Sequence, residues 1–493
     1  MSIQTIGIVG AGFAGLSTAK VLKALGYQVQ VFEKEPEVGG VWAASRRYPG
    51  LTTQNVRSTY ALSDYPMPSS YPEWPSGEQV QAYMQGYVER FGLAPHILLN
   101  TEVQSAVLDE TAGAWTVAAK TAGASETTSH RFDYLVVCNG IFSDPAVPAF
   151  AGREAFVASG GRICHTSQFN DAKDATGKHV LVVGYGKSSC DVANAIADTS
   201  TSTTVLARTL IWKIPKKFMN VLNYKFLLLT RMGEALFKYI ELKGFEKFLH
   251  GAGKPIRDSM LGSVESVVTR QLKLRQIGLH PGTSLETIAR STVSLVSDGF
   301  YDKVAAGRLK VTQAVVEELM PGRARLSDGS TVPADIVVCG TGWHQRVPFL
   351  DAALMARVTD AHGNFRLYRS MLPPYVPRLA FNGYNSSFFS QLNCEIGALW
   401  LGDLLKGGLT LPPRDWQIAM IDRRLAWMEE RTDGKHSKGT NIIPFSVHHI
   451  DELLQDMGLQ LGAATRFKQW LGPIDPRDYQ VVTRRLLKRH AAT

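Results

Sequence analysis

Two stretches of the chain, at residues 5–19 and 179–193, share one pattern: an apolar run, a glycine-rich turn and a segment that can form a helix. The first reads TIGIVGAGFAGLSTA and the second reads HVLVVGYGKSSCDVA. An apolar run of this kind is typical of a parallel strand that is buried on both faces. A glycine-rich turn between such a strand and a helix leaves backbone N–H groups free to hold a phosphate. The sequence therefore predicts an α/β fold with two Rossmann-like dinucleotide-binding domains.

The first unit carries the full GxGxxG pattern at Gly10, Gly12 and Gly15. In such a loop the first glycine allows a sharp turn, the second leaves room for a pyrophosphate, and the third lets the helix pack closely on the strand. A second strand, QVQVFE, ends at Glu33, where an acidic residue can accept hydrogen bonds from both hydroxyls of a ribose. These features predict a site for a dinucleotide with free ribose hydroxyls, such as FAD.

The second unit repeats the pattern with two changes. Ser188 and Ser189 stand where a third glycine would be expected after Gly184-x-Gly186. The following strand, TTVLAR, ends at Arg208 instead of a carboxylate. A carboxylate would repel a 2′-phosphate, whereas a guanidinium can bind it through two parallel hydrogen bonds, so this unit is predicted to bind NADPH. Three lysines follow the strand and are expected to add positive charge: Lys213, Lys216 and Lys217.

The composition argues against several other classes of protein. The net charge is +9, but the lysines and arginines are spread along the chain without a block of five, so nucleic-acid binding is not favoured. The longest apolar runs fall far short of the ~20 residues that a membrane span needs, and the first strand begins too close to Met1 for a signal peptide. The five cysteines are scattered, with no CxxC pair and no cluster that suggests a metal. We therefore expect a cytoplasmic enzyme with no metal and no transmembrane segment.

Several stretches, taken in order, resemble the flavin-containing monooxygenases, which are related to the Baeyer–Villiger monooxygenases. Besides the two loops, the similar segments are EKEPEVGGVW, residues 48–66, residues 100–117, VVCNG, DIVVCGTGW and LAFNGYN. Between the two units, SGGRICHTSQF resembles the fingerprint of the family, with Phe169 at its end and Ser159 where a phenylalanine is usual. Phe169 favours the flavin-containing monooxygenases, because the Baeyer–Villiger enzymes have tryptophan at this place.

The resemblance implies a discontinuous FAD-binding domain, formed by residues 1–150 and 335–493, with an NADPH-binding domain at 170–334 inserted into it. Residues 218–295 have no counterpart in the shortest members of the family, and their apolar residues recur at helical spacing with lysines between them. We expect a helical insert that covers the substrate entrance, rests on a membrane surface or packs as an ordinary layer on the NADPH domain. Near the C-terminus, DWQIAMIDRRLAWMEERT predicts an amphipathic helix and RRLLKRH a solvated tail.

The implied activity is that of an FAD-dependent, NADPH-consuming monooxygenase. In this family the reduced flavin reacts with dioxygen to a C4a-(hydro)peroxyflavin, which transfers one oxygen atom to a soft nucleophile such as an amine nitrogen or a sulfide. Baeyer–Villiger oxidation of a ketone is the alternative, and a non-oxygenating NADPH–flavin oxidoreductase or a redox-sensing binding protein is a further one. The expected partners are a small organic substrate and dioxygen, without nucleic acid, and the helical insert could pair two subunits as a homodimer.

The resemblance also identifies site residues. Gln54 and Asn55 fall where the family places an amide beside the flavin, and Arg57 follows near the cofactor phosphates or on the surface. His165 lies on the connection between the two units, where it could act in acid–base chemistry or hold the backbone. Further contacts to the cofactors are expected near the motifs, from Ala14, Lys34, Gly40, Val41, Trp42, Ser63, Asp64, Val103, Gly140, Thr341, Gly342 and Asn385.

Overall fold

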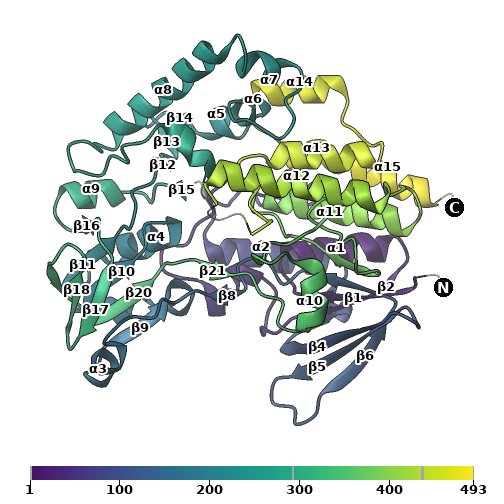
Figure 1. The fold of residues 1–493 in the computed structure, drawn as a ribbon, viewed down its shortest axis with the longest axis horizontal. Coiled ribbons are helices and arrows are strands. Elements are labelled where there is room, and N and C mark those ends of the chain that lie inside the picture. The colour runs from purple at the N-terminus through teal and green to yellow at the C-terminus, as the bar shows by residue number, and fades with distance from the viewer. Residues whose placement is uncertain (1–2, 291–293, 435–437, 492–493) are drawn as a thin grey trace.

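The computed structural model describes residues 3–290, 294–434 and 438–491 (Figure 1). Its frame consists of two five-stranded sheets in which every pairing is parallel. The first sheet contains, in order, β22 (Leu379–Phe381), β7 (Tyr134–Val137), β1 (Thr5–Val9), β2 (Gln28–Phe32) and β3 (Ile97–Leu98). The second contains β16 (Lys310–Thr312), β11 (Ser202–Leu206), β10 (His179–Val183), β20 (Ile336–Cys339) and β9 (Arg162–His165). The prediction of two Rossmann-like units is confirmed.

Strand β1 is the centre of the first sheet because its apolar side chains can be buried on both faces. Ile6 is fully buried and pairs with Val29 on one side and with Tyr134 on the other. Helix α1 (Phe13–Ala24) follows directly and lies against α11 (Ser390–Leu405). The two helices approach so closely that a Cβ on Gly402 would lie 2.5 Å from Leu25 Cδ1. A segment near the C-terminus therefore completes the unit that the N-terminus begins.

The second unit is wider than the range 170–334 that the resemblance implies. Strand β9 precedes this range and β20 follows it, yet both lie in the second sheet, with Ile336 paired to Val180 and to Arg162. The sequence could not separate β20 from the FAD domain because an apolar strand reads the same in either sheet. The two segments that connect the units run together, since β8 (Asp144–Pro145) pairs antiparallel with β21 (Trp343–His344).

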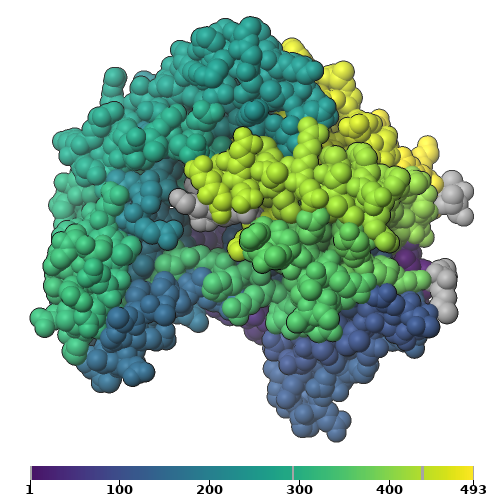
Figure 2. Space-filling view, viewed as in Figure 1, coloured from purple at the N-terminus to yellow at the C-terminus, as the bar shows by residue number. Residues whose placement is uncertain are grey.

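Smaller elements extend both units. Three antiparallel strands, β4 (Thr101–Asp109), β5 (Ala114–Thr121) and β6 (Thr128–Phe132), project from the first unit, and β17 (Val316–Met320), β18 (Arg323–Leu326) and β19 (Thr331–Pro333) from the second. In Figure 2 the β4–β6 sheet and the second unit form separate lobes at the bottom of the view. The remaining helices of these units are α2 (Gly77–Arg90), α3 (Arg153–Ala158), α4 (Lys187–Ile196), α9 (Phe300–Ala305) and α10 (Ala352–Val358).

Residues 218–295 contain the expected helices. Two short strands pair in parallel at the base of the insert: β12 (Lys213–Ile214), which precedes it, and β15 (Ser294–Leu295), which ends it. Between them lie the hairpin β13 (Lys217–Phe218) and β14 (Leu222–Asn223) and the helices α5 (Lys225–Leu228), α6 (Arg231–Ala235), α7 (Phe245–Leu249) and α8 (Lys254–Gln271). At the top of Figure 1 these helices adjoin the C-terminal helices α12 (Arg414–Thr432), α13 (Ser446–Asp456) and α14 (Ala463–Leu471).

Buried ion pairs join the insert to the C-terminal helices. Arg231 of α6 donates to both carboxylate oxygens of Asp451, at 2.5 and 2.9 Å. His448 of α13 lies between the carboxylates of Glu234 and Glu246, with 2.7 Å from each ring nitrogen to an oxygen. Burial alone would lower the pKa of His448, but the hydrogen bonds to both carboxylates outweigh it and raise the pKa to about 10. The insert is thus bound by charge to the C-terminal helices.

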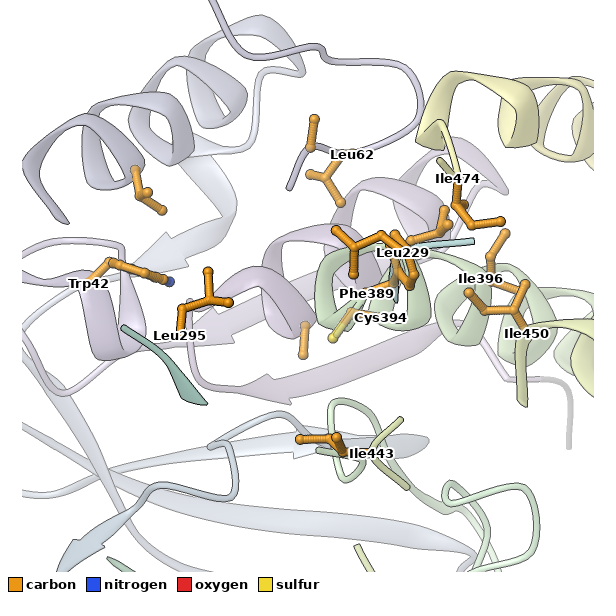
Figure 3. Close-up of a cluster of buried hydrophobic side chains, with 14 of the residues drawn as sticks. Trp42, Leu62, Leu229, Leu295, Phe389, Cys394, Ile396, Ile443, Ile450 and Ile474 are labelled. Carbon is orange, nitrogen blue, oxygen red and sulfur yellow. The ribbon is translucent and has the colours of Figure 1, made fainter. Parts of the chain in front are cut away.

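One apolar core links these regions with the first unit. Figure 3 shows side chains from the glycine-rich segment, the insert and the C-terminal helices in the same cluster, among them Trp42, Leu229, Ile396 and Ile450. The last three are completely buried. Burial of apolar surface is the main favourable term in folding, so the insert and the C-terminal helices are part of the folded core.

The basic C-terminal segment is a helix packed on the protein, and the prediction of a solvated tail is wrong. Helix α15 (Gln480–Ala491) buries Val482 and Leu486 completely. Arg489 donates to Asp403 Oδ2 at 2.8 Å, and the Asp403 side chain is fully buried. Val482 and Leu486 are spaced to lie on one face of a helix, but the basic residues around them made the segment read as solvated.

Candidate functional site

The first glycine-rich loop is closed so tightly that two of its positions exclude any side chain. A Cβ on Gly15 would overlap the carbonyl oxygen of Gly10, and one on Gly10 would lie 2.5 Å from the Cys138 carbonyl oxygen. The Gly10 N–H donates to the Phe32 carbonyl at 2.8 Å, which fixes the turn at the carboxyl end of β1. The start of α1 therefore lies directly against the sheet, with its N–H groups at the edge where parallel strands end.

Glu33 lies at this edge as the sequence predicts. Its side chain is 6% exposed, and its Oε2 accepts a hydrogen bond from the Ala11 N–H of the loop at 2.7 Å. Its Oε1 accepts from the Glu35 N–H at 3.0 Å. Burial raises the pKa of the Glu33 carboxyl, and the two N–H groups oppose that shift. Each carboxylate oxygen keeps a lone pair that a ribose hydroxyl could use.

Two other segments meet the first loop through close backbone contacts. A Cβ on Gly40 would lie 3.2 Å from Gly12 Cα, and one on Gly383 would lie 2.9 Å from Ala14 Cβ. Near them, Asn385 Oδ1 is buried without a hydrogen-bond partner among the described residues. An extended polar ligand such as a flavin would supply the missing donor, so these residues fit FAD.

Tyr60 packs against Trp42 in this region. The ring centroids of Tyr60 and Trp42 lie 5.7 Å apart, and Gln391 Oε1 is buried without a partner within the described part of the chain. Of the other predicted contact residues, Val41 is 37% exposed, Val103 is buried at an irregularity of β4, and Gly140 has open space around its Cα. Lys34 is exposed beside Glu33. The segments therefore meet, but the individual roles of these residues stay predictions.

The second loop repeats the geometry of the first with one exchange. The Gly184 N–H donates to the Leu206 carbonyl at 2.9 Å, as Gly10 does to Phe32. Ser189 takes the place of the third glycine and is fully buried. Its side chain fits because Gly340, on the neighbouring strand end, has none: a Cβ there would overlap Ser189 Oγ. Gly186 precedes α4 without side-chain contacts nearby, and Ser188 is half-buried in its first turn.

Arg208 is exposed two residues beyond the end of β11, on the same sheet edge as this loop. The three lysines that were expected to add positive charge here also have contacts of their own. Lys213 is 1% exposed, donates to Ser294 Oγ at 3.0 Å, and has its pKa lowered by burial. Lys216 pairs with Asp298 at 2.7 Å, and Lys217 lies 3.8 Å from Glu73. Arg208 thus presents an exposed guanidinium at this strand end, while Lys213 is buried.

Gln54 and Asn55 point to different parts of the protein. Gln54 Oε1 accepts from the Leu295 N–H at 3.1 Å, and its carbonyl accepts from Tyr224 Oη at 2.6 Å, so it is held by the insert. Asn55 is 2% exposed, and its Nδ2 donates to the Phe388 carbonyl at 2.8 Å. That carbonyl directly precedes α11, in the last segment that resembles a flavin contact. Gln54 is thus bound to the insert and Asn55 to the segment before α11, and the amide that lies beside the flavin stays a prediction.

Arg57, Ser63 and Asp64 are held by neighbouring protein groups. Arg57 Nη1 donates to the Tyr71 carbonyl at 2.7 Å. Ser63 donates from its N–H and its Oγ to the two oxygens of Glu395, at 2.7 and 2.8 Å. Asp64 pairs with Lys20 at 2.5 Å. Through these bonds the three residues hold the segment 57–64 in place. Their contacts to a cofactor or to a substrate stay predictions.

Glu395 and Lys20 form a buried charge cluster that sequence reasoning missed. Glu395 on α11 is fully buried, and burial raises its pKa to about 6, with Asp64 adding to the shift. Lys20 on α1 is 7% exposed and opposes that shift. The one available signal was a lysine on the apolar face of a predicted helix, which is rarely buried unless it is paired. The cluster ties α1 to α11.

His165 holds the crossing between the two units. Its Nδ1 accepts from the Ser167 N–H at 3.2 Å, so the proton is on Nε2, which donates to the Gly342 carbonyl at 3.0 Å. The ring centroids of His165 and Trp343 lie 4.5 Å apart in an edge-to-face arrangement, and Thr341 Oγ1 donates to the Ala146 carbonyl. Burial lowers the pKa of His165 to about 4, with Arg46 adding to the shift. A neutral imidazole with both nitrogens bonded fits the structural role.

The described residues offer neither a metal site nor a membrane-spanning helix. None of their His, Cys, Asp and Glu side chains gather in a group of three that could hold a metal. No helix among them has the length and apolar character needed to cross a membrane.

Comparison with known proteins decides the family. Residues 3–464 match the profile of the flavin-binding monooxygenase-like family. The chain belongs to this family. It is therefore an FAD-dependent monooxygenase that uses NADPH, as the two loops and the resemblance predict. Phe169, on which the resemblance to the flavin-containing monooxygenases partly rests, is fully buried.

Relatives match over nearly the whole length. A probable flavin-containing monooxygenase 1 of Arabidopsis thaliana is 26% identical over 98% of this chain and 97% of its own. Flavin-containing monooxygenase 5 of Rattus norvegicus is 25% identical over 87% of this chain and 79% of its own. The structure of an S-allyl-L-cysteine S-oxygenase from Allium sativum aligns with a TM-score of 0.65 at 18% identity, covering 100% and 99% of the two chains. A structure titled as OTEMO with FAD and NADP gives 0.71 at 16% identity, covering 95% and 98%. The last two show a shared fold.

The pKa of His165 leads to a test of its structural role. The folded protein holds a proton on this ring less tightly than the unfolded chain does. The group therefore contributes stability above pH 6.5 that is lost as the pH falls through about 4. In H165Q we expect the free energy of unfolding to change less between pH 4 and 6.5 than in the wild type, by up to roughly 3 kcal/mol. Urea unfolding at several pH values measures this difference.

The exposed neighbour His344 provides the control. H344Q should keep the pH dependence of the wild type. An equal pH dependence in H165Q and the wild type would contradict the neutral, buried imidazole.

Proposed function

We propose that this monooxygenase oxygenates a small organic molecule at a nitrogen or a sulfur atom. The observation that carries the proposal is the pair of similar loops whose second strands end in opposite charges, Glu33 and Arg208. A carboxylate suits a ribose diol, and an exposed guanidinium suits a 2′-phosphate. One site for each nucleotide allows a hydride donor and a flavin to be bound at the same time.

The first loop is proposed to hold FAD, which when bound supplies the redox chemistry with dioxygen. The N–H groups that follow Gly10 and Gly12 would hold the pyrophosphate, and Glu33 the ribose of the adenosine. Asn385 Oδ1, buried without a partner among the described residues, would accept a hydrogen bond from the bound cofactor. Lys20, Asp64 and Glu395 keep α1 and α11 together beneath that site.

The second loop is proposed to hold NADPH. Gly184 and Gly186 leave its backbone open, and Arg208 would bind the 2′-phosphate. Gly340 packs against Ser189 of the second loop. Two residues further on, the Gly342 carbonyl accepts a hydrogen bond from His165 in the connection to the first unit. His165 would thus hold the second loop in place relative to the first unit without exchanging a proton.

Asn55 is proposed to act at the reacting centre. Its Nδ2 is fixed by the Phe388 carbonyl, and its side chain is almost completely buried. A fixed amide in a site shielded from water can orient a reacting group without proton transfer. Gln54 is proposed to support it by binding the insert. A cytoplasmic location and a homodimer stay predictions from the sequence.

Product analysis tests the proposed reaction. The purified protein with FAD and NADPH is supplied with methyl phenyl sulfide or with cyclohexanone. We expect the sulfoxide and no lactone, because the peroxidic oxygen of this branch is taken up by soft nucleophiles. Lactone as the main product would favour Baeyer–Villiger oxidation, and NADPH consumption that yields only hydrogen peroxide would favour a non-oxygenating oxidoreductase.

Removal of Arg208 tests the assignment of the second loop. R208A should lower kcat/KM for NADPH by about 10- to 100-fold and leave that for NADH nearly unchanged, because charge-assisted hydrogen bonds to the 2′-phosphate are lost. R323A, at an exposed arginine of β18, is the matched control and should leave both values near those of the wild type. A parallel loss for both nucleotides would contradict the assignment.

A further inference from the structure

A cavity of about 340 Å³ is lined mainly by residues of the insert, and neither glycine-rich loop contributes a described residue to its lining. Its walls come from the end of β12, from the α5–α6 region, from α8 and from the 3-10 helix Leu285–Arg290. Protein interiors are packed nearly as densely as organic crystals, and voids larger than a water molecule are few. A space of this size is within the range of small-molecule sites.

The lining is chemically uniform. No described residue that lines the cavity is charged, and aliphatic side chains such as Ile214, Leu228, Leu261 and Ile288 dominate it. The hydroxyls present are already used, because Thr230 Oγ1 accepts from the Gly233 N–H and Ser263 Oγ donates to the Ser259 carbonyl. A charged or strongly polar occupant would lose its hydration without compensation. Such a cavity selects an uncharged, apolar molecule.

The rim of the cavity reaches the surface. Phe226 and Met260, which line it, are 49% and 39% exposed. Trp470 of α14 lines it as well, and its ring lies 6.1 Å from that of Phe245. Aromatic and methionine side chains at a rim can adapt to ligands of different shape. A molecule from solution can therefore reach the cavity at the outer face of the insert.

The inner walls of the cavity are tied to the proposed reacting centre. Ile214 pairs with Leu295, whose N–H donates to Gln54 Oε1. Tyr224, which directly precedes α5 and its cavity residue Leu228, donates to the Gln54 carbonyl. Both walls are thus connected by hydrogen bonds to Gln54, the neighbour of Asn55.

We infer that this cavity binds an uncharged apolar organic molecule and that this molecule is the substrate, held in the insert before it reacts. The second half of this inference rests on the proposed function. The first half rests on the shape and chemistry of the cavity alone. The insert then acts as the element that selects the substrate.

Binding of a neutral fluorescent probe tests the first half. The holoprotein is titrated with N-phenyl-1-naphthylamine, and its fluorescence gives the dissociation constant. M260D places a charge at the rim and S263W places bulk there, and each should weaken binding by about tenfold or more. I256D is the matched control, because Ile256 is on the same helix and 56% exposed but does not line the cavity, and it should bind like the wild type. Absence of probe binding, or equal losses in M260D and I256D, would overturn the inference.

Turnover of two sulfides tests the second half. With methyl phenyl sulfide, M260D and S263W should raise KM by about tenfold while kcat changes little, and S-methylcysteine should show no such effect. An unchanged KM for methyl phenyl sulfide in both variants, with probe binding still weakened, would overturn the assignment of the occupant as substrate. If the probe responds as expected but no sulfide is oxygenated, the cavity stands as a ligand site and the proposed function fails.

Discussion

The structure depends on the close approach of a helix to the end of a parallel strand, made twice in the same chain. In the first unit this approach requires that Gly15 has no side chain, because the Gly10 carbonyl fills the space. In the second unit it is Gly340 that must lack a side chain, because the Ser189 side chain fills the space beside it. Both solutions bring the first N–H groups of a helix to the sheet edge, where a phosphate can be bound.

The positions of the two loops relative to each other are set by elements far from the phosphate sites. His165, Gly342 and Trp343 hold the crossing between the units. On the opposite side, the insert and the C-terminal helices join through Arg231–Asp451 and through His448 between two carboxylates. Removing one partner of such buried pairs is costly, because a charge is left without compensation. These contacts fix the two nucleotide sites relative to each other. The insert, in addition, contains a cavity of its own.

Local sequence patterns predicted the parts of the fold that local chemistry determines. The two loops, the strand ends at Glu33 and Arg208, and the helices of the insert and of residues 414–432 follow from glycine spacing and periodicity. The assignment of β20 to the second sheet could not be predicted, since strand partners are chosen by long-range packing. Three further features could not be predicted for the same reason. They are the burial of Lys213, the cluster of Lys20, Asp64 and Glu395, and the packing of helix α15. In each case a charged residue that reads as solvated on its own finds a partner only in the folded chain.

We propose that each loop binds a different dinucleotide and that the charge at the strand end decides which. The most direct measurement is a crystal structure of the protein with FAD and NADP⁺. It should place the FAD pyrophosphate on the loop at residues 10–15 with its ribose on Glu33, and the 2′-phosphate of NADP⁺ in contact with the Arg208 guanidinium. A 2′-phosphate bound away from Arg208, or NADP⁺ seated on the first loop, would contradict the account.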